Sequence, residues 1–166
     1  GSVIVQSEPG KGSSFIVEIP CRIVSEEERI DQAEQSMPEN FLKCKRILLV
    51  EDNELNVEIA RTILQDVQAE VEVAADGAIA VAMLQKAPVG YYDVILMDIQ
   101  MPKMNGYQAT EAIRKLPDER AQVPIIAMTA NAFEEDRQAA FAAGMDDYLA
   151  KPIEIDKLLR KIVKVL

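Results

Sequence analysis

The sequence contains no histidine, and only two of its residues are cysteine. Histidine-based acid–base, nucleophilic or metal chemistry within this chain is therefore excluded. Cys21 and Cys44 lie far apart and form no CxxC motif. This spacing argues against a zinc site and favours two reduced thiols in a cytoplasmic protein.

Positive charge is also scarce, with 18 lysines and arginines against 28 aspartates and glutamates and a net charge of −10. Such a field repels nucleic acids and anionic membranes, and no local basic patch offsets it. The longest apolar runs, at 94–97 and 125–128, are too short to span a bilayer, and no signal peptide opens the chain. We expect a cytoplasmic chain that binds no nucleic acid and makes no membrane contact, although its parent could be membrane-anchored elsewhere.

Three segments differ in character. Residues 1–20 contain two β-branched runs around a turn rich in glycine, proline and serine, which predicts a β-hairpin. A lone hairpin is marginal in water, so this one needs a sheet to join. Residues 21–44 are acidic and contain glutamine, serine and proline, as is typical of a linker. Residues 45–166 show the regular alternation of a folded domain.

In that domain, short apolar runs alternate with segments of helical periodicity. We predict strands at 47–50, 70–73, 94–97, 124–128 and 148–150, and helices after Asn53, after Asp76, and at 107–115, 132–143 and 155–165. Strands that are apolar on both faces indicate a parallel sheet between helices. We therefore predict an α/β, doubly wound, five-stranded parallel sheet with helices on both faces. The flavodoxin-like strand order 2-1-3-4-5 is assigned by analogy.

The helical spacing also predicts which side chains line the core. The helix after Asn53 carries apolar residues at helical spacing, namely Leu55, Ile59, Ile63 and Leu64. In the helix after Asp76, we expect four residues to face inward: Ile79, Ala80, Met83 and Leu84.

Chemistry-bearing residues follow four of the five strands. Glu51 and Asp52 come after the first strand, Asp98 after the third, Thr129 after the fourth and Lys151 after the fifth. In open parallel sheets the functional site lies at the carboxyl ends of the strands. Each residue alone has an ordinary structural explanation, as a helix cap, a turn residue or a surface charge. Their joint placement predicts that three carboxylates, one hydroxyl and one ammonium converge.

Clustered carboxylates repel one another and need a counter-charge. Mg²⁺ suits oxygen ligands and accepts phosphate oxygens, and Mn²⁺ would substitute for it. We expect Glu51, Asp52 and Asp98 to hold the cation, together with a backbone carbonyl near Gln100. Asp98 is also the candidate nucleophile for an aspartyl phosphate, and Lys151 would pair with it. Phosphoryl transfer needs positioning and charge neutralisation, which these groups would supply.

These residues resemble the motifs of the response-regulator receiver family. The segments ILLVEDN at 47–53, DIQMPKMNG at 98–106, MTA at 128–130 and YLAKP at 148–152 occur in the family's order and cover about 120 residues. The resemblance implies that Asp98 is the phosphorylation site, that Thr129 and Tyr148 form a conformational switch, and that Gln100 and Asn131 tune hydrolysis. It also implies a cis Lys151–Pro152 bond.

Residues 1–15, GSVIVQSEPGKGSSF, resemble the last two strands of a histidine-kinase ATP-binding domain. This resemblance implies that the chain is a fragment of a hybrid sensor histidine kinase, without the kinase core and without a DNA-binding output domain. Its expected partners are a histidine kinase core, a histidine phosphotransfer protein, or both. Whether the fragment is an enzyme stays open, because a receiver promotes its own phosphorylation and dephosphorylation. A homodimer is also open, since the hairpin could pair with the edge strand of another copy.

Two other functions compete with the phosphorelay module. One is a pseudo-receiver, a protein-interaction module that is never phosphorylated, although the complete set of site residues argues against it. The other is a Mg²⁺-dependent phosphatase with an aspartyl intermediate. That chemistry needs a second acid near the nucleophile, and the chain has Gln100 where the acid would be placed.

Overall fold

The computed structural model describes residues 1–8, 12–19, 41–130 and 134–166. These residues belong to two compact units, Gly1–Ser36 and Met37–Leu166. The predicted linker, residues 21–44, lies largely outside the described residues. Its last four residues form a turn that places Leu42, fully buried, in the core of the second unit. Cys44 in this turn is a free, exposed thiol, whereas Cys21 lies outside the described residues.

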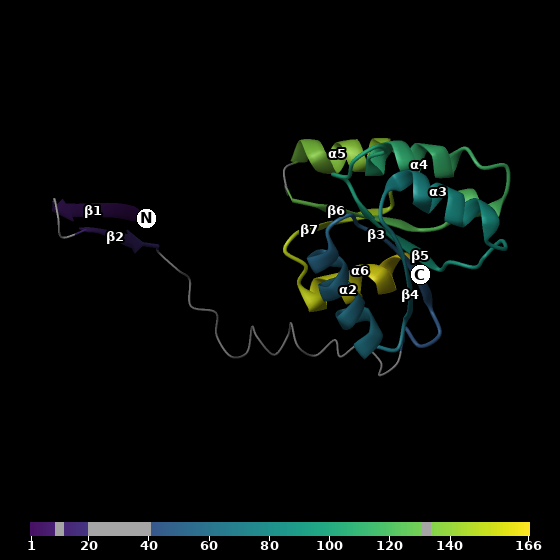
Figure 1. The fold of residues 1–166 in the computed structure, drawn as a ribbon, viewed down its shortest axis with the longest axis horizontal. Coiled ribbons are helices and arrows are strands. Elements are labelled where there is room, and N and C mark those ends of the chain that lie inside the picture. Colours follow the sequence, from purple (N-terminus) through teal and green to yellow (C-terminus); the bar gives the residue numbers. More distant parts are fainter. Residues whose placement is uncertain (9–11, 20–40, 131–133) are drawn as a thin grey trace. The chain divides into compact units, whose positions relative to one another are not determined.

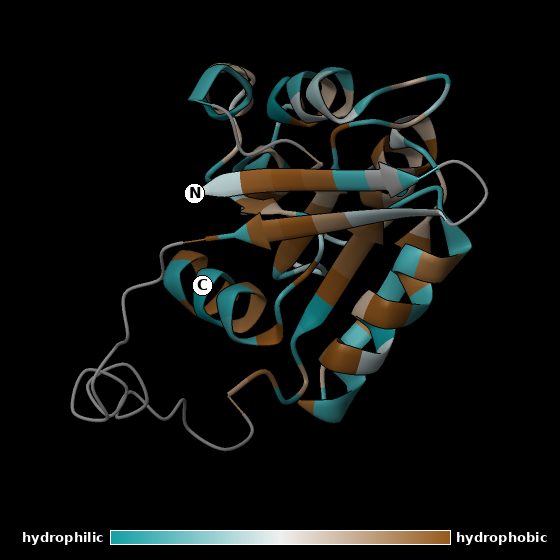
Figure 2. Ribbon diagram, turned by 90° about the vertical axis from the view of Figure 1, so that its left-hand side faces the viewer, coloured by the Kyte–Doolittle hydropathy of each residue, from teal (hydrophilic) through white to brown (hydrophobic). Residues whose placement is uncertain are grey.

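The first unit contains the predicted hairpin, in which β1 (Ser2–Glu8) pairs antiparallel with β2 (Gly12–Glu18). Apolar side chains occupy the middle of both strands, as the brown segment beside the N label in Figure 2 shows for β1. Side chains on both faces of the hairpin are exposed, including Val3, Ile4 and Phe15. The hairpin therefore has no core of its own.

The second unit is built on five parallel strands in the order β4-β3-β5-β6-β7 (Figure 1). Their bounds are Arg46–Val50 (β3), Glu70–Ala74 (β4), Val94–Asp98 (β5), Ile125–Thr129 (β6) and Asp147–Ala150 (β7). Counted within this unit, the order is 2-1-3-4-5, which confirms the predicted topology. The central strands β5 and β6 are buried along their whole length.

Helices cover both faces of the sheet, α3, α4 and α5 on one and α2 and α6 on the other (Figure 1). Their bounds are Glu54–Asp66 (α2), Gly77–Lys86 (α3), Gly106–Arg114 (α4), Glu134–Ala142 (α5) and Ile155–Val165 (α6), and a 3₁₀ turn at Glu119–Gln122 (η1) was not predicted. Asn53 caps α2 and Asp76 caps α3, as expected. The predicted opening of α5 at Asn131 lies outside the described residues.

Two helix faces differ from the prediction. Ile79 was expected to face inward, but its side chain is 41% exposed, so that prediction is wrong. Leu55 and Ile59 share the helical spacing of the buried Ile63 and Leu64, yet they are 68% and 45% exposed. Both lie in the first half of α2, next to the carboxyl ends of the strands, and helical periodicity alone does not show where a helix extends past the sheet that covers it.

Candidate phosphoacceptor site

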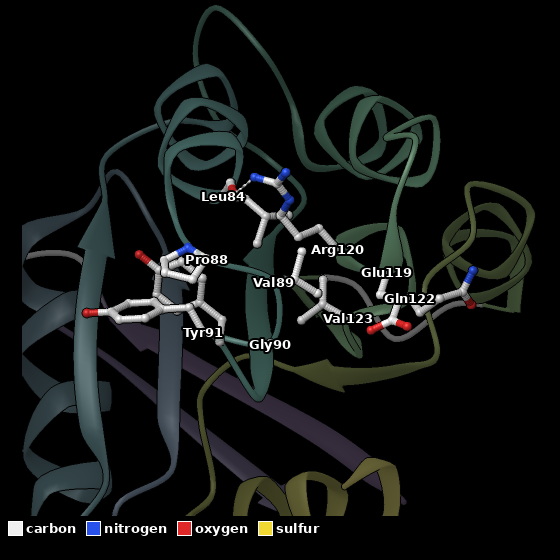
Figure 3. A pocket seen from close by; sticks show the side chains of 10 residues that line it. Leu84, Pro88, Val89, Gly90, Tyr91, Glu119, Arg120, Gln122 and Val123 are labelled. Carbon is white, nitrogen blue, oxygen red and sulfur yellow. Dashed lines mark hydrogen bonds between the residues drawn. The ribbon is translucent and has the colours of Figure 1, made fainter.

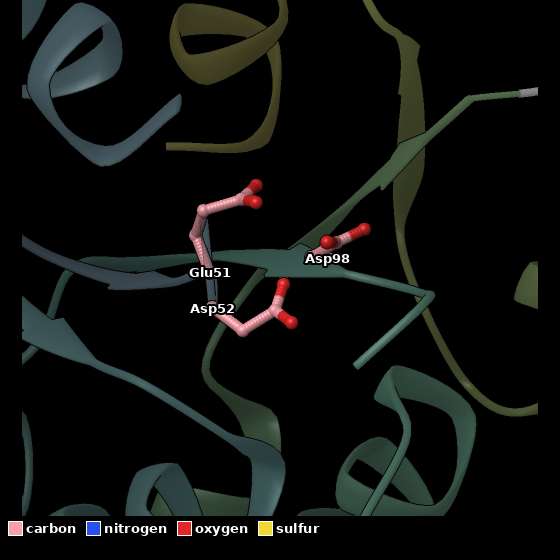
Figure 4. Close-up of side chains that lie close together, drawn as sticks. All are labelled: Glu51, Asp52 and Asp98. Carbon is pink, nitrogen blue, oxygen red and sulfur yellow. The ribbon is translucent and has the colours of Figure 1, made fainter. Parts of the chain in front are cut away.

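Three carboxylates meet at the carboxyl ends of β3 and β5. Glu51 and Asp52 directly follow β3, and Asp98 is the last residue of β5. Each offers an oxygen within 4.8 Å of the others, and the side chains point toward a common centre in Figure 4. Glu51 and Asp98 are buried, whereas Asp52 is exposed. The cluster is thus open to solvent on the side of Asp52.

Lys151 bridges the two buried carboxylates. It lies just after β7, and its Nζ is 2.7 Å from Glu51 Oε2 and 2.9 Å from Asp98 Oδ2. The backbone N–H of Lys151 donates to the carbonyl of Thr129, which brings the end of β7 to the end of β6. The Lys151–Pro152 bond is cis, as the family resemblance implied.

The surroundings in this site raise the pKa values of both Asp98 and Lys151. Burial raises the pKa of the Asp98 carboxyl most, and the charge of Glu51 raises it further, against the opposing hydrogen bonds from Lys151 and the Gln100 N–H. Burial by itself lowers the pKa of Lys151, but the hydrogen bonds to Glu51 and Asp98 outweigh it and raise that pKa. The Lys151 ammonium therefore stays charged. The buried Asp98 carboxylate would be stabilised by additional positive charge.

The loop after β5 is tied to Asp98 by short-range contacts. The Gln100 N–H donates to Asp98 Oδ1 at 3.2 Å, and the Ile99 N–H donates to the Met128 carbonyl at 3.0 Å. At the far end of the loop, the Gly106 N–H donates to the Ile99 carbonyl at 3.1 Å. The loop therefore folds back on its own beginning and brings the start of α4 close to Asp98.

Thr129 and Tyr148, the two predicted switch residues, lie on the paired strands β6 and β7. Thr129 ends β6 and is buried beside the end of β5. Tyr148 lies in β7, half-buried, with the Phe141 ring edge-on at 6.3 Å and Lys161 Nζ 4.7 Å from its ring centre. The roles of these residues stay predictions, as does that of Gln100. Asn131 lies outside the described residues.

One residue of the site escaped the sequence analysis. Asn56, in the first turn of α2, donates from Nδ2 to Glu51 Oε1 at 2.9 Å, and the Asn53 N–H donates to the same oxygen at 3.3 Å. Glu51 is thus held by the helix cap on one oxygen and by Lys151 on the other. The only signal in the sequence was that Asn56 lies five residues after Glu51. This spacing does not distinguish an asparagine that contacts Glu51 from one exposed on the surface.

The residues present fit a divalent cation. Within the cluster as described, a single ammonium faces three carboxylates, so negative charge is in excess. Oxygen ligands on two buried side chains and one exposed side chain suit a hard cation that keeps some of its water.

A hollow of about 190 Å³ lies at the end of the sheet opposite the carboxylate cluster (Figure 3). Its lining includes Tyr92 and Val123, which precede β5 and β6. Arg120 is already engaged there, since it donates to the carbonyls at the end of α3 and pairs with Asp118 at 2.6 Å.

Comparison with known proteins identifies the family of this chain. The family model for the response regulator receiver domain matches residues 47–163. The aerobic respiration control sensor protein ArcB of Escherichia coli is 40% identical over 166 residues, a match that covers 99% of this chain and 20% of ArcB. The hairpin therefore lies within the match, and the chain spans about a fifth of the length of that relative. No helix among the described residues is long and apolar enough to cross a membrane.

Solved receiver structures share the fold. The receiver domain of the sensor histidine kinase PA1611 from Pseudomonas aeruginosa, solved with a magnesium ion in its active-site cleft, is 41% identical, with a TM-score of 0.66 and coverage of 73% of this chain and 96% of that one. A co-crystal of the yeast histidine phosphotransfer protein Ypd1 with the receiver domain of Ssk1 matches at 29% identity and a TM-score of 0.66, covering 74% and 89%. The chain therefore belongs to the response regulator receiver family.

Proposed function

We propose that Asp98 accepts a phosphoryl group from a phosphohistidine outside this chain, with Mg²⁺ held by Glu51, Asp52, Asp98 and the backbone carbonyl of Gln100. The observation that carries the proposal is the state of Asp98. Its carboxylate is buried among two other carboxylates, with Lys151 on Oδ2 and the Gln100 N–H on Oδ1. This carboxylate is held in one orientation and needs added positive charge.

The chemistry follows from those contacts. The N–P bond of the donor breaks, its electron pair returns to the imidazole nitrogen, and an O–P bond forms on the Asp98 carboxylate. Lys151 and the Thr129 hydroxyl would bind the phosphoryl oxygens, because both lie at the same edge of the sheet as Asp98. Mg²⁺ would neutralise developing charge on those oxygens. The phosphoryl group then passes to a histidine phosphotransfer protein or is hydrolysed.

The parent protein is, in this proposal, a hybrid sensor histidine kinase whose core supplies the phosphohistidine. The match to ArcB, which includes the hairpin as well as the receiver, supports that arrangement. The absence of histidine from this chain is consistent with it, since the donor histidine must then lie elsewhere.

The proposal predicts a single phosphoryl adduct on the wild-type chain. We expect intact-mass spectrometry, after incubation with Mg²⁺ and a small phosphodonor, to show one added phosphoryl group that disappears in Asp98→Asn and with a chelator. Asp156→Asn removes an exposed carboxylate from the first turn of α6 and should leave the adduct unchanged. A wild-type chain that stays unmodified with both a small donor and a phosphohistidine protein would instead be an unphosphorylated interaction module.

The surface beside Lys151 offers a place for the phosphotransfer partner. Asn56, Ile59, Lys151, Pro152 and Ile153 line a hollow of about 140 Å³ between α2 and the segment after β7. The exposed Leu55 adds to this apolar surface. A partner seated here would bring its histidine to the edge where Asp98 lies. The co-crystal of Ypd1 with a receiver domain supports a histidine phosphotransfer protein as the occupant.

This docking surface predicts a loss that depends on the donor. We expect Ile59→Ser to lower the rate of phosphoryl transfer with a histidine phosphotransfer domain about tenfold, as for a central apolar contact. Modification by a small donor should be unchanged, because Ile59 is not one of the carboxylates or their counter-charge. Val89→Ser, an equally exposed change at the opposite end of the sheet, is the matched control. Equal losses with both donors would show that Ile59 acts on the site itself.

A further inference from the structure

The tip of the phosphoacceptor loop, residues 99–105 between β5 and α4, contacts the start of α3 at two points. Lys103 Nζ lies 3.0 Å from Asp76 Oδ2. One residue on, the Met104 carbonyl accepts from the Gly77 N–H at 3.3 Å. Asp76 and Gly77 lie about 20 residues before Asp98 in the sequence, so these contacts connect a separate βα unit to the loop that begins at the phosphoacceptor.

Asp76 is suited to act as a fixed anchor. Its side chain is buried, and its Oδ1 accepts the Ile79 N–H at 2.8 Å as the cap of α3. The carboxylate therefore cannot turn away without uncapping the helix. Lys103 is the opposite case, since its side chain is 76% exposed and gains little from burial. Its backbone adopts the left-handed region with φ 64°, which is unfavourable for a residue with a side chain. A specific contact must offset that cost.

The approach of the two segments is also very close. A Cβ atom added to Gly77 would lie 2.7 Å from the Met104 carbonyl oxygen and 2.8 Å from the Ala109 Cβ. Only glycine fits at this position without moving the loop or α4. The loop is thus held at three places: at its start by β6, at its end by its own first residue, and at its tip by α3.

We propose that Asp76 and Lys103 are positioning residues that hold the phosphoacceptor loop in place for the divalent cation. The inference rests on the proposed function, because it takes the Gln100 carbonyl, in this loop, as a ligand. Fixing the tip of the loop places that carbonyl before the cation arrives. Without the Asp76–Lys103 pair, the loop would become ordered only when the cation binds. The free energy of ordering would then reduce the binding free energy, and the affinity would fall.

The direction in which Mg²⁺ affinity changes when the Lys103 charge is removed distinguishes loop positioning from a long-range electrostatic effect. Removing the positive charge of Lys103 makes the acidic site more negative, so a purely long-range effect predicts tighter binding of Mg²⁺. Loss of loop positioning predicts weaker binding. Lys103→Met keeps an unbranched side chain of similar length and removes the ammonium group, so the two explanations give opposite results for one variant.

The experiment measures Mg²⁺ binding to the whole chain by calorimetry and amide hydrogen exchange of residues 99–105. We expect Lys103→Met to raise the Kd for Mg²⁺ about threefold to fivefold, the scale of one partly exposed ion pair, and to speed exchange in the loop. Lys103→Arg should restore both. Lys115→Met removes a lysine from another surface pair, with Glu111 on α4, and should change neither.

Asp76→Asn tests the same pair from the other side, because asparagine keeps the helix cap and loses the charge. We expect Asp76→Asn and the double variant with Lys103→Met to match Lys103→Met alone, since each removes the same interaction. Unchanged or tighter Mg²⁺ binding in Lys103→Met, or additive losses in the double variant, would overturn the proposal. Both readouts are independent of phosphorylation, so a wild-type chain that binds Mg²⁺ but forms no aspartyl phosphate would contradict the proposed function and leave this test intact.

Discussion

Replacing Lys151 with methionine is expected to lower the free energy of unfolding by about 3–5 kcal/mol in cation-free buffer. The ammonium is the counter-charge for two buried carboxylates, at 2.7 Å from Glu51 and 2.9 Å from Asp98. Without it, two like charges remain close together in a site that already raises the pKa of Asp98 through burial. Urea unfolding followed by circular dichroism measures the loss.

Two additions identify the cause of that loss. Because the cation would take over the role of the ammonium, a given Mg²⁺ concentration should stabilise the variant more than the wild type. At a hundred times the variant's Kd the gain is about 2.7 kcal/mol. Changing Glu51 to glutamine in the same variant should also recover stability, since one of the repelling charges is gone. Lys157→Met removes an equally short pair, with Glu154 at 2.8 Å, in which both side chains are exposed, and should cost less than about 1 kcal/mol. If Lys157→Met lost as much free energy of unfolding, the Lys151 pairing would contribute no more to stability than an exposed ion pair.

The main features of the site could be predicted because the geometry of parallel sheets is regular. Strands that are apolar on both faces, such as 94–97, identify a sheet between helices, and their carboxyl ends meet at one edge. Reading the residue after each strand was therefore enough to bring Glu51, Asp98 and Lys151 together, although the first and last are 100 positions apart.

What the sequence could not show is how each side chain divides its contacts. Lys151 was expected to pair with Asp98, but the structure also places it on Glu51. The anchors Asn56 and Lys103 were missed because a polar residue in a first helical turn or a loop is usually solvated. Asn56 contacts Glu51 within its own βα unit, whereas Lys103 contacts Asp76 of a separate βα unit.

The same limit applies to the apolar positions. Ile79 follows the periodicity of a core residue but lies on the surface, whereas Leu42 stands in an acidic, linker-like stretch and is fully buried. Periodicity reports a face of a helix, and tertiary packing decides how much of that face is covered. At Leu55 and Ile59 the apolar face of α2 stays exposed next to the site, and such an exposed apolar surface is consistent with a partner protein.

Gly106→Ala should have the second large effect, on the rate of phosphorylation. A Cβ atom here would overlap the backbone carbonyl of Asp98 and lie 3.0 Å from the Ile99 Cα. Neither can yield easily, because Asp98 is the last residue of the buried strand β5 and the Ile99 N–H is bonded to Met128. We expect a loss of about 1–3 kcal/mol in stability and, through misplacement of the carboxylate, about a hundredfold slower formation of the aspartyl phosphate.

Gly90→Ala is the matched control. Gly90 also has a special conformation, with φ 73°, but an added Cβ would meet nothing within 4 Å, and the residue lies at the opposite end of the sheet. It should lose about 1–2 kcal/mol of stability and keep the wild-type rate, measured as the mass adduct over time. If both variants slow phosphorylation equally, the rate follows global stability. If Gly106→Ala alone is slow at a temperature where both are folded, the rate depends on how closely α4 is held against the backbone of Asp98.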